Sequence, residues 1–262
     1  MDHDTLRALL EWQIELGADE AIGDAPVDRY ALGDSPPARA PAPRPAPPAA
    51  SAAAPSAPVS EDPVIAARQA AAAAADLAAL AEAMAAFPHC ELRRGARNCV
   101  FADGRAGARV MVIGEAPGRD EDLRGLPFVG RAGQLLDRMF AAIGMGRELP
   151  DTGRALYITN ILPWRPPENR RPTAAECAMM LPFVERHVEL AAPDVLVLMG
   201  NTPLQTILGG GGITRRRGIW SRALGLPVLP MFHPAYLLRT PSAKREAWAD
   251  LLSLQARLRG DG

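Results

Sequence analysis

Arg109-Val-Met-Val-Ile-Gly-Glu-Ala-Pro-Gly118 is the stretch of sequence that decides the fold. Its apolar run is typical of a strand buried on both faces, and the run ends in a polar residue, Glu115. The same pattern recurs at residues 156–160, 195–201 and 228–233. Parallel sheets bind ligands at the carboxyl ends of their strands. We therefore expect Glu115, Asn160 and His233 to meet at one crevice.

Helical patterns separate the four predicted strands. They cover residues 133–143, 173–190, 202–208 and 242–258, and Thr173 with Glu176 forms a capping-box pattern at the start of the second. Residues 119–122 are predicted to form a solvated loop. Alternating strands and helices predict a three-layer α/β/α fold around a central, mostly parallel, four-stranded sheet.

The chain divides into three parts. Residues 1–30 are predicted to form an amphipathic helix segment, because apolar side chains recur at helical spacing at Leu6, Leu9, Leu10 and Ile14. Residues 31–60 are an Ala/Pro-rich flexible linker. Residues 61–262 form the folded domain, which opens on an Ala-rich helix over 61–86. The N-terminal helix either docks on its own domain or binds a separate protein partner, and both alternatives remain open.

The charges are segregated along the chain. Residues 1–86 hold 5 basic and 13 acidic residues, a net charge of −8, whereas residues 87–262 hold 24 basic and 17 acidic residues, a net charge of +7. All of the basic residues except Lys244 are arginines, whose planar guanidinium matches phosphate geometry. A GC-rich genome would explain the choice of Arg but not the asymmetry. The pattern favours a domain that binds a polyanion.

Several classes of protein are excluded. No run of 18 apolar residues is present, so we expect no membrane span. The acidic start lacks the basic region of a signal peptide, and three cysteines cannot form an even disulfide framework. We expect a cytoplasmic protein that is a monomer, and that is found at the nucleoid if the polyanion is DNA.

Two loops carry further candidate residues. Phe128 lies in a compact apolar loop, where an aromatic ring is either part of the core or a platform on which a base stacks. Phe232-His-Pro-Ala-Tyr-Leu-Leu-Arg239 places an apolar pair, Leu237 and Leu238, before a basic residue. Such a pair, if exposed, suits a wedge that enters a DNA duplex.

The ordered series of these motifs resembles a known family. It consists of Gly114-Glu-Ala-Pro-Gly118 with Glu121-Asp122, residues 125–136, Asn160, Arg165-Pro-Pro167, Asn169-Arg170, Pro193-Asp194, Gly200, Ile213-Thr-Arg215, residues 233–239, Lys244-Arg245 and Trp248. The series is similar to that of the uracil-DNA glycosylase superfamily, in its iron–sulfur (family 4) branch, over roughly residues 87–258.

The resemblance implies that the protein removes uracil from DNA. Glu115 would orient or activate the attacking water, Asn160 would bind the base edge and His233 would donate to the uracil O2. The uracil site would be lined by Gly114, Ala116, Glu121 and Phe128. The contacts with DNA would come from Arg165, Leu237, Leu238 and Arg239. The alternative is a non-catalytic DNA-binding relative, and the presence of Glu115, Asn160 and His233 favours the enzyme.

One departure from the family concerns its 4Fe–4S cluster. The resemblance implies four cysteine ligands, but Cys90 is the only cysteine in register. The other three positions hold Phe87, Trp164 and, at or near the fourth, Met180. Cys99, Cys177 and His89 leave open some other metal site. We expect no cofactor, and apolar packing where the cluster lies in the family.

Overall fold

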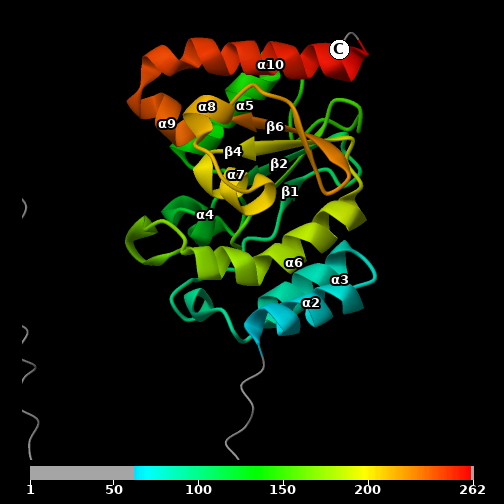
Figure 1. Ribbon diagram of the computed structural model, residues 1–262, viewed down its shortest axis with the longest axis vertical. Coiled ribbons are helices and arrows are strands. Elements are labelled where there is room, and N and C mark those ends of the chain that lie inside the picture. Colours follow the sequence, from blue (N-terminus) through cyan, green and yellow to red (C-terminus); the bar gives the residue numbers. More distant parts are fainter. Residues whose placement is uncertain (1–61, 261–262) are drawn as a thin grey trace, which may run out of the picture. The chain divides into compact units, whose positions relative to one another are not determined.

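A six-stranded sheet organises the fold in the computed structural model, which describes residues 62–260 (Figure 1). The strands are β1 (Asp103–Gly104), β2 (Val110–Gly114), β3 (Leu156–Asn160), β4 (Val195–Met199), β5 (Ser221–Ala223) and β6 (Leu226–Met231). Their order is β1-β3-β2-β4-β6-β5. The predicted helix segment 1–30 and linker 31–60 lie outside the described residues and stay predictions.

The four strands predicted from the sequence form the parallel centre of this sheet, in the order β3-β2-β4-β6. The predicted fold class is therefore confirmed. Two short antiparallel edge strands, β1 and β5, were not predicted, because strands of two and three residues are too short to show an alternating pattern. All four parallel strands end at the same edge of the sheet, which brings their polar ends together.

One face of the sheet is covered by α6 (Ala174–Ala191), against which α2 (Pro63–Ala73) and α3 (Leu77–Ala86) pack (Figure 1). Met111 and Ile113 of β2 belong to the core on this side. The predicted single helix over 61–86 is wrong, because the chain breaks between α2 and α3. Asp76 begins the second helix by accepting a hydrogen bond from the Ala79 N–H.

The other face is covered by α5 (Arg131–Ala141) and α10 (Lys244–Arg259). Val110 and Val112 of β2 belong to the core on this side, so alternate residues of the strand serve the two cores. Every residue of β2, β3 and β4 is buried, which explains why these strands are continuous apolar runs in the sequence.

Short helices fill the loops around the sheet. They are α4 (Arg119–Arg124), α7 (Asn201–Leu208), α8 (Ile213–Arg216), α9 (Pro234–Arg239), η1 (Glu91–Arg94), η2 (Pro167–Asn169) and η3 (Pro241–Ala243). The predicted loop at 119–122 is in fact α4, which ends at Gly125 in the left-handed conformation. The predicted capping box of Thr173 and Glu176 is confirmed at the start of α6. Within residues 62–260, no helix combines the length and apolarity needed to cross a bilayer.

Candidate active site

Glu115 and Asn160 are held side by side at the ends of two neighbouring strands. Gly114 of β2 is paired with Asn160 of β3. The backbone pairing continues past the strand ends, because the Ile161 N–H donates to the Gly114 carbonyl at 2.9 Å and the Leu162 N–H to the Glu115 carbonyl at 3.1 Å. The local backbone therefore fixes both side chains at the same edge of the sheet.

Gly114 makes room for two side chains of the site. A Cβ at this position would overlap with the Asn160 Oδ1 and with the ring of Phe128. The Phe128 ring therefore lies directly against the end of β2. It also stacks on His233, with 5.4 Å between ring centroids and 28° between ring planes. The structure thus brings Gly114, Asn160, Phe128 and His233 together, from four separate segments of the chain.

Glu115 contacts the helix that follows β4. The Thr202 hydroxyl of α7 lies 2.5 Å from the Glu115 Oε2 and donates a hydrogen bond to it. This contact joins the ends of β2 and β4, between which the strand order reverses, and such a switch point is where open α/β sheets bind ligands. Glu115 is partly exposed, and its second oxygen has no hydrogen-bond partner in the part of the chain that the structure describes. That oxygen is free to hold a water molecule.

His233 is the N-cap of α9, and its ring is oriented by the helix backbone. The Ala235 N–H donates to Nδ1 of His233 at 3.1 Å. A neutral imidazole with Nδ1 as acceptor carries its proton on Nε2. Burial, together with the positive charge of Arg239, lowers the pKa of His233 from its ordinary 6.5 to about 4. At neutral pH the ring is therefore uncharged and offers a single donor, Nε2–H.

Asn160 is buried, with 6% of its surface exposed, and it lies at the carboxyl end of β3. Its side-chain amide makes no hydrogen bond to any other residue between 62 and 260. The amide is not among the fully buried polar groups that lack a partner, so its one acceptor and two donors are accessible to a ligand.

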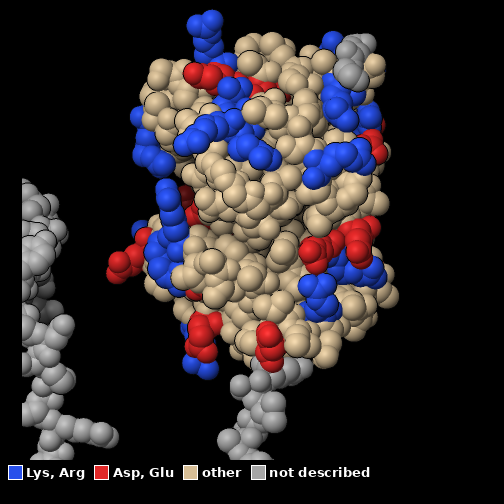
Figure 2. Space-filling model, viewed as in Figure 1, with Lys and Arg blue, Asp and Glu red and all other residues tan. Residues whose placement is uncertain are grey.

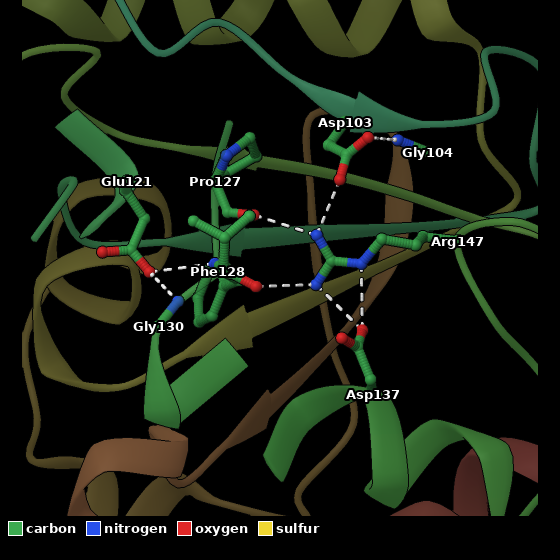
Figure 3. A network of polar contacts seen from close by, with 9 residues as sticks. Asp103, Gly104, Glu121, Pro127, Phe128, Gly130, Asp137 and Arg147 are labelled. Carbon is green, nitrogen blue, oxygen red and sulfur yellow. Dashed lines mark hydrogen bonds and ion pairs between the residues drawn. The ribbon is translucent and has the colours of Figure 1, made fainter. Parts of the chain in front are cut away.

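Glu121 binds loop backbone, although the sequence placed it among the residues that line the base site. Its Oε1 accepts from the Val129 N–H at 2.9 Å and the Gly130 N–H at 2.8 Å, and its Oε2 accepts from the Gly118 N–H at 3.1 Å. Figure 3 shows the carboxylate turned toward the loop that carries Phe128. Glu121 therefore acts on the site indirectly, by holding the backbone of the loop that carries Phe128. Ala116 packs against the core on the α6 side of the sheet.

The residues expected to touch DNA differ in exposure. Leu237 is 1% exposed and packs in a small core with Phe232, so the prediction of an exposed leucine pair is wrong for Leu237. Leu238 is partly exposed, and Arg239 is exposed at the end of α9. Arg165 is partly exposed and donates to the Asn169 Oδ1 at 2.8 Å. The helical period of α9 explains the difference between the two leucines, because consecutive residues of a helix face different ways.

Figure 2 shows Lys and Arg side chains on several sides of the molecule, among them the side where α4 and α9 lie, where Asp and Glu side chains are interspersed. This is the side on which the parallel strands end, because α9 begins directly after His233. The Lys and Arg side chains near the strand ends can pair with the phosphates of a nucleic acid.

Comparison with known proteins identifies the family. The model of the uracil DNA glycosylase superfamily matches residues 101–252. The chain belongs to the uracil DNA glycosylase superfamily. It is 40% identical to a type-4 uracil-DNA glycosylase of Thermotoga maritima over 156 residues, which cover 58% of this chain and 78% of the relative. It is 38% identical to the type-4 enzyme of Archaeoglobus fulgidus over 172 residues, covering 62% and 82%.

A more distant branch of the superfamily also matches. The chain is 31% identical to a type-5 uracil-DNA glycosylase of Pyrobaculum aerophilum over 146 residues, which cover 51% of this chain and 64% of the relative. The resemblance deduced from the ordered motifs is thus confirmed at the level of the superfamily.

The side chains at the expected cluster positions do not fit a 4Fe–4S cluster. Phe87, Trp164 and Met180 are buried in one apolar core together with Cys90, and none of the three supplies a thiolate. Burial raises the pKa of Cys90, which favours the neutral thiol over the ligand form. No group of three potential ligands gathers anywhere in residues 62–260, and this includes His89, Cys99 and Cys177.

Two features of the site were not found from the sequence. The first is Thr202, which follows Gly200 and Asn201 at the end of β4. Asn201 has a structural role, because its Oδ1 accepts from the Ile213 N–H at 2.8 Å. Arg147 lies between α5 and β3 in a segment without a recognisable motif. No spacing pattern in the sequence signals either contact. A cavity of about 320 Å³ between α6 and α7 shares only Thr202 with the site, so it is not the base site.

Proposed function

We propose that this protein is a uracil-DNA glycosylase, which hydrolyses the bond between uracil and deoxyribose and so initiates base excision repair. The observation that carries the proposal is the meeting of Asn160, Phe128 and His233 beside Glu115 at the strand ends. Membership of the superfamily supports it. No P-loop or spaced-glycine motif offers a nucleotide-binding alternative.

Base recognition follows from the free polar groups of the site. The target nucleotide rotates out of the duplex, which costs least where uracil is mispaired. Phe128 stacks on the extruded base, and stacking of this kind contributes roughly 1–3 kcal/mol. The unpaired Asn160 amide offers both donors and an acceptor to the uracil edge, which carries both kinds of group.

The chemistry requires a place for negative charge and a nucleophile. As the bond from C1′ to N1 breaks, its electron pair moves onto the uracil ring and O2. The Nε2–H of His233 donates to that oxygen, and a neutral donor already in place is the arrangement that stabilises developing charge. Glu115, held by Thr202, orients a water whose oxygen bonds to C1′, and the Glu115 carboxylate accepts the proton that this water releases. The uracil anion then takes up one proton through solvent and Glu115 loses the one it accepted, so the products are free uracil and an abasic site.

The duplex is held by residues around the site. Arg165 and Arg239 bind phosphates, which their solvent exposure supports, and partly exposed Leu238 fills the gap that the extruded nucleotide leaves. Leu237 supports Leu238 from the core and is not a second wedge.

We also propose that apolar packing replaces the cluster of the iron–sulfur branch. The support is the chemistry of the side chains present, because Phe87, Trp164 and Met180 are buried without sulfur ligands for iron. No catalytic step assigned to Glu115, Asn160 or His233 passes through that part of the molecule.

One assay tests the proposed function. The full-length protein is incubated with single-stranded DNA and with G:U duplex, without added metal, and abasic sites are cleaved to reveal uracil release. We expect release from both substrates, and a loss of release but not of DNA binding in Glu115→Gln. Binding without any release from either substrate would mean that the chain is a non-catalytic relative.

A further inference from the structure

The loop that carries Phe128 has a backbone that needs support. Phe128 has a φ of +53°, in the left-handed region that residues with a side chain rarely adopt. A residue held there costs on the order of 1–3 kcal/mol and persists only where its surroundings fix it. The ring of this residue is the proposed stacking platform, so whatever fixes the backbone also fixes the platform.

Arg147 is the residue that meets this loop from outside the site (Figure 3). Its Nη1 donates to the Pro127 carbonyl and its Nη2 to the Phe128 carbonyl, both at 2.9 Å. Its other contacts are to two carboxylates: Nη1 to Asp103 at 2.7 Å, and Nε and Nη2 to Asp137 at 2.9 and 2.8 Å. A guanidinium has five N–H donors, and all five are used.

The two ends of one peptide group are held by opposite partners. The Phe128 carbonyl accepts from Arg147, and the Val129 N–H of the same peptide group donates to Glu121. This double contact fixes the backbone rotation on both sides of that peptide plane. Gly133 at the start of α5 packs so close to the Phe128 carbonyl that a Cβ there would overlap with it. Arg147, Glu121 and Gly133 therefore all contact the backbone of this loop.

Arg147 itself cannot bind substrate. Its side chain is 10% exposed, and it has no free donor for a phosphate or a base. Its two carboxylate partners come from different elements, Asp103 from the edge strand β1 and Asp137 from α5. Because each carboxylate orients the guanidinium, the sheet edge and α5 together set the position of the loop.

We propose that Arg147 is a positioning residue for base recognition, which acts by holding Phe128 in its stacking conformation. The expected effect on uracil binding rests on the proposed function, whereas the contact between Arg147 and the loop does not depend on it. The alternative is that Arg147 stabilises only the general fold between α5 and β3. The two ideas differ in where the effect of a substitution appears.

The test compares Arg147→Gln with Arg147→Lys and with a control, Arg154→Gln. Arg154 lies in the same segment, is exposed, and donates to the Gly144 carbonyl, away from the site. Three quantities are measured on the full chain: the single-turnover rate of uracil release, inhibition by free uracil, and hydrogen exchange of peptides spanning residues 126–131.

We expect Arg147→Gln to weaken inhibition by free uracil about tenfold and to slow uracil release about tenfold. The reason is that a neutral, shorter side chain cannot reach the carbonyls of both Pro127 and Phe128. Exchange should accelerate in residues 126–131 and stay unchanged in β2 and β4. In all three measurements Arg147→Lys should give values between those of Arg147→Gln and those of the unchanged protein. Arg154→Gln should behave as the unchanged protein. In a Phe128→Ala background, Arg147→Gln should change uracil inhibition by less than about twofold, because the platform is already absent.

Additive effects of Arg147→Gln and Phe128→Ala would overturn the inference, as would exchange that accelerates equally throughout the domain. If Arg147→Gln does not fold, Asp137→Asn gives a second test, because it removes the charge of a half-exposed partner of Arg147 and we expect the fold to remain intact. Loop-specific exchange in Asp137→Asn then supports the inference, and its absence overturns it. If the unchanged protein releases no uracil, the proposed function fails, while the exchange comparison still decides whether Arg147 holds the loop.

Discussion

Nδ1 of His233 lies 3.1 Å from the backbone nitrogen of Ala235, and this contact decides which ring nitrogen carries the proton. The ring is left with Nε2–H as its donor. Burial keeps the ring neutral at physiological pH, because it lowers the pKa of His233 to about 4. The helix start that holds the histidine therefore also sets its chemistry.

The first prediction concerns the protonation of His233. Nitrogen NMR of the labelled protein should show an Nε2-protonated neutral ring with a titration midpoint near 4, so uracil release should show no step from this residue near neutral pH. The unfolded chain binds the proton below pH 6.5, so the stability that the neutral ring confers is complete above 6.5 and is lost as pH falls toward 4. A midpoint close to 6.5 would contradict the assignment.

The second prediction concerns Gly114. Gly114→Ala should slow uracil release by about a hundredfold while the protein stays folded, because the new Cβ displaces both the Asn160 amide and the Phe128 ring. Gly95→Ala is the matched control, because a Cβ there meets nothing within 4 Å. Rates are measured under single-turnover conditions, and an equal effect of both substitutions would mean that crowding at Gly114 is not the cause.

The third prediction concerns Thr202. Thr202→Val removes the hydroxyl that holds Glu115 and keeps the side-chain shape. A hydrogen bond to a charged group contributes about 1.5–3 kcal/mol, so release should slow by about tenfold or more at unchanged DNA affinity. Thr202→Ser keeps the hydroxyl and should retain most of the rate. A Val variant as fast as the Ser variant would show that Glu115 needs no such support.

The fourth prediction separates duplex from single-stranded DNA. Leu238→Ala should slow release from G:U duplex and leave release from single strands nearly unchanged, because only the duplex has a gap to fill. Leu252→Ala, on the exposed face of α10, is the control for removing an exposed leucine. Equal losses on both substrates would place Leu238 among the residues that shape the pocket.

The fifth prediction concerns the packing at the expected cluster positions. Trp164 is 2% exposed, so Trp164→Ala should lower the free energy of unfolding by about 3–5 kcal/mol in urea titrations. Trp248 is 43% exposed, and Trp248→Ala should change the free energy of unfolding by about 0.5 kcal/mol or less. A broad absorbance band at about 400 nm in anaerobically purified protein would contradict the apolar packing by revealing a cluster.

The sequence by itself determined the four parallel strands and the polar residues that end them. It could do so because strands buried on both faces must be continuous apolar runs, and a parallel sheet places its carboxyl ends together. The ordered motifs likewise determined the superfamily. The two-residue strand β1 and the break between α2 and α3 were not predicted from the sequence, because neither changes the local composition.

Only the tertiary structure decided which side chains hold the site in place. Thr202 lies 87 residues along the chain from Glu115, whose carboxylate it holds. Arg147 lies 19 residues from Phe128, whose carbonyl it holds. No local pattern in the sequence indicates such contacts. The burial of Leu237 beside exposed Arg239 was likewise decided by how α9 packs on its small core. Periodicity in a sequence reports which face of an element is apolar, whereas long-range hydrogen bonds depend on how those elements are placed in space.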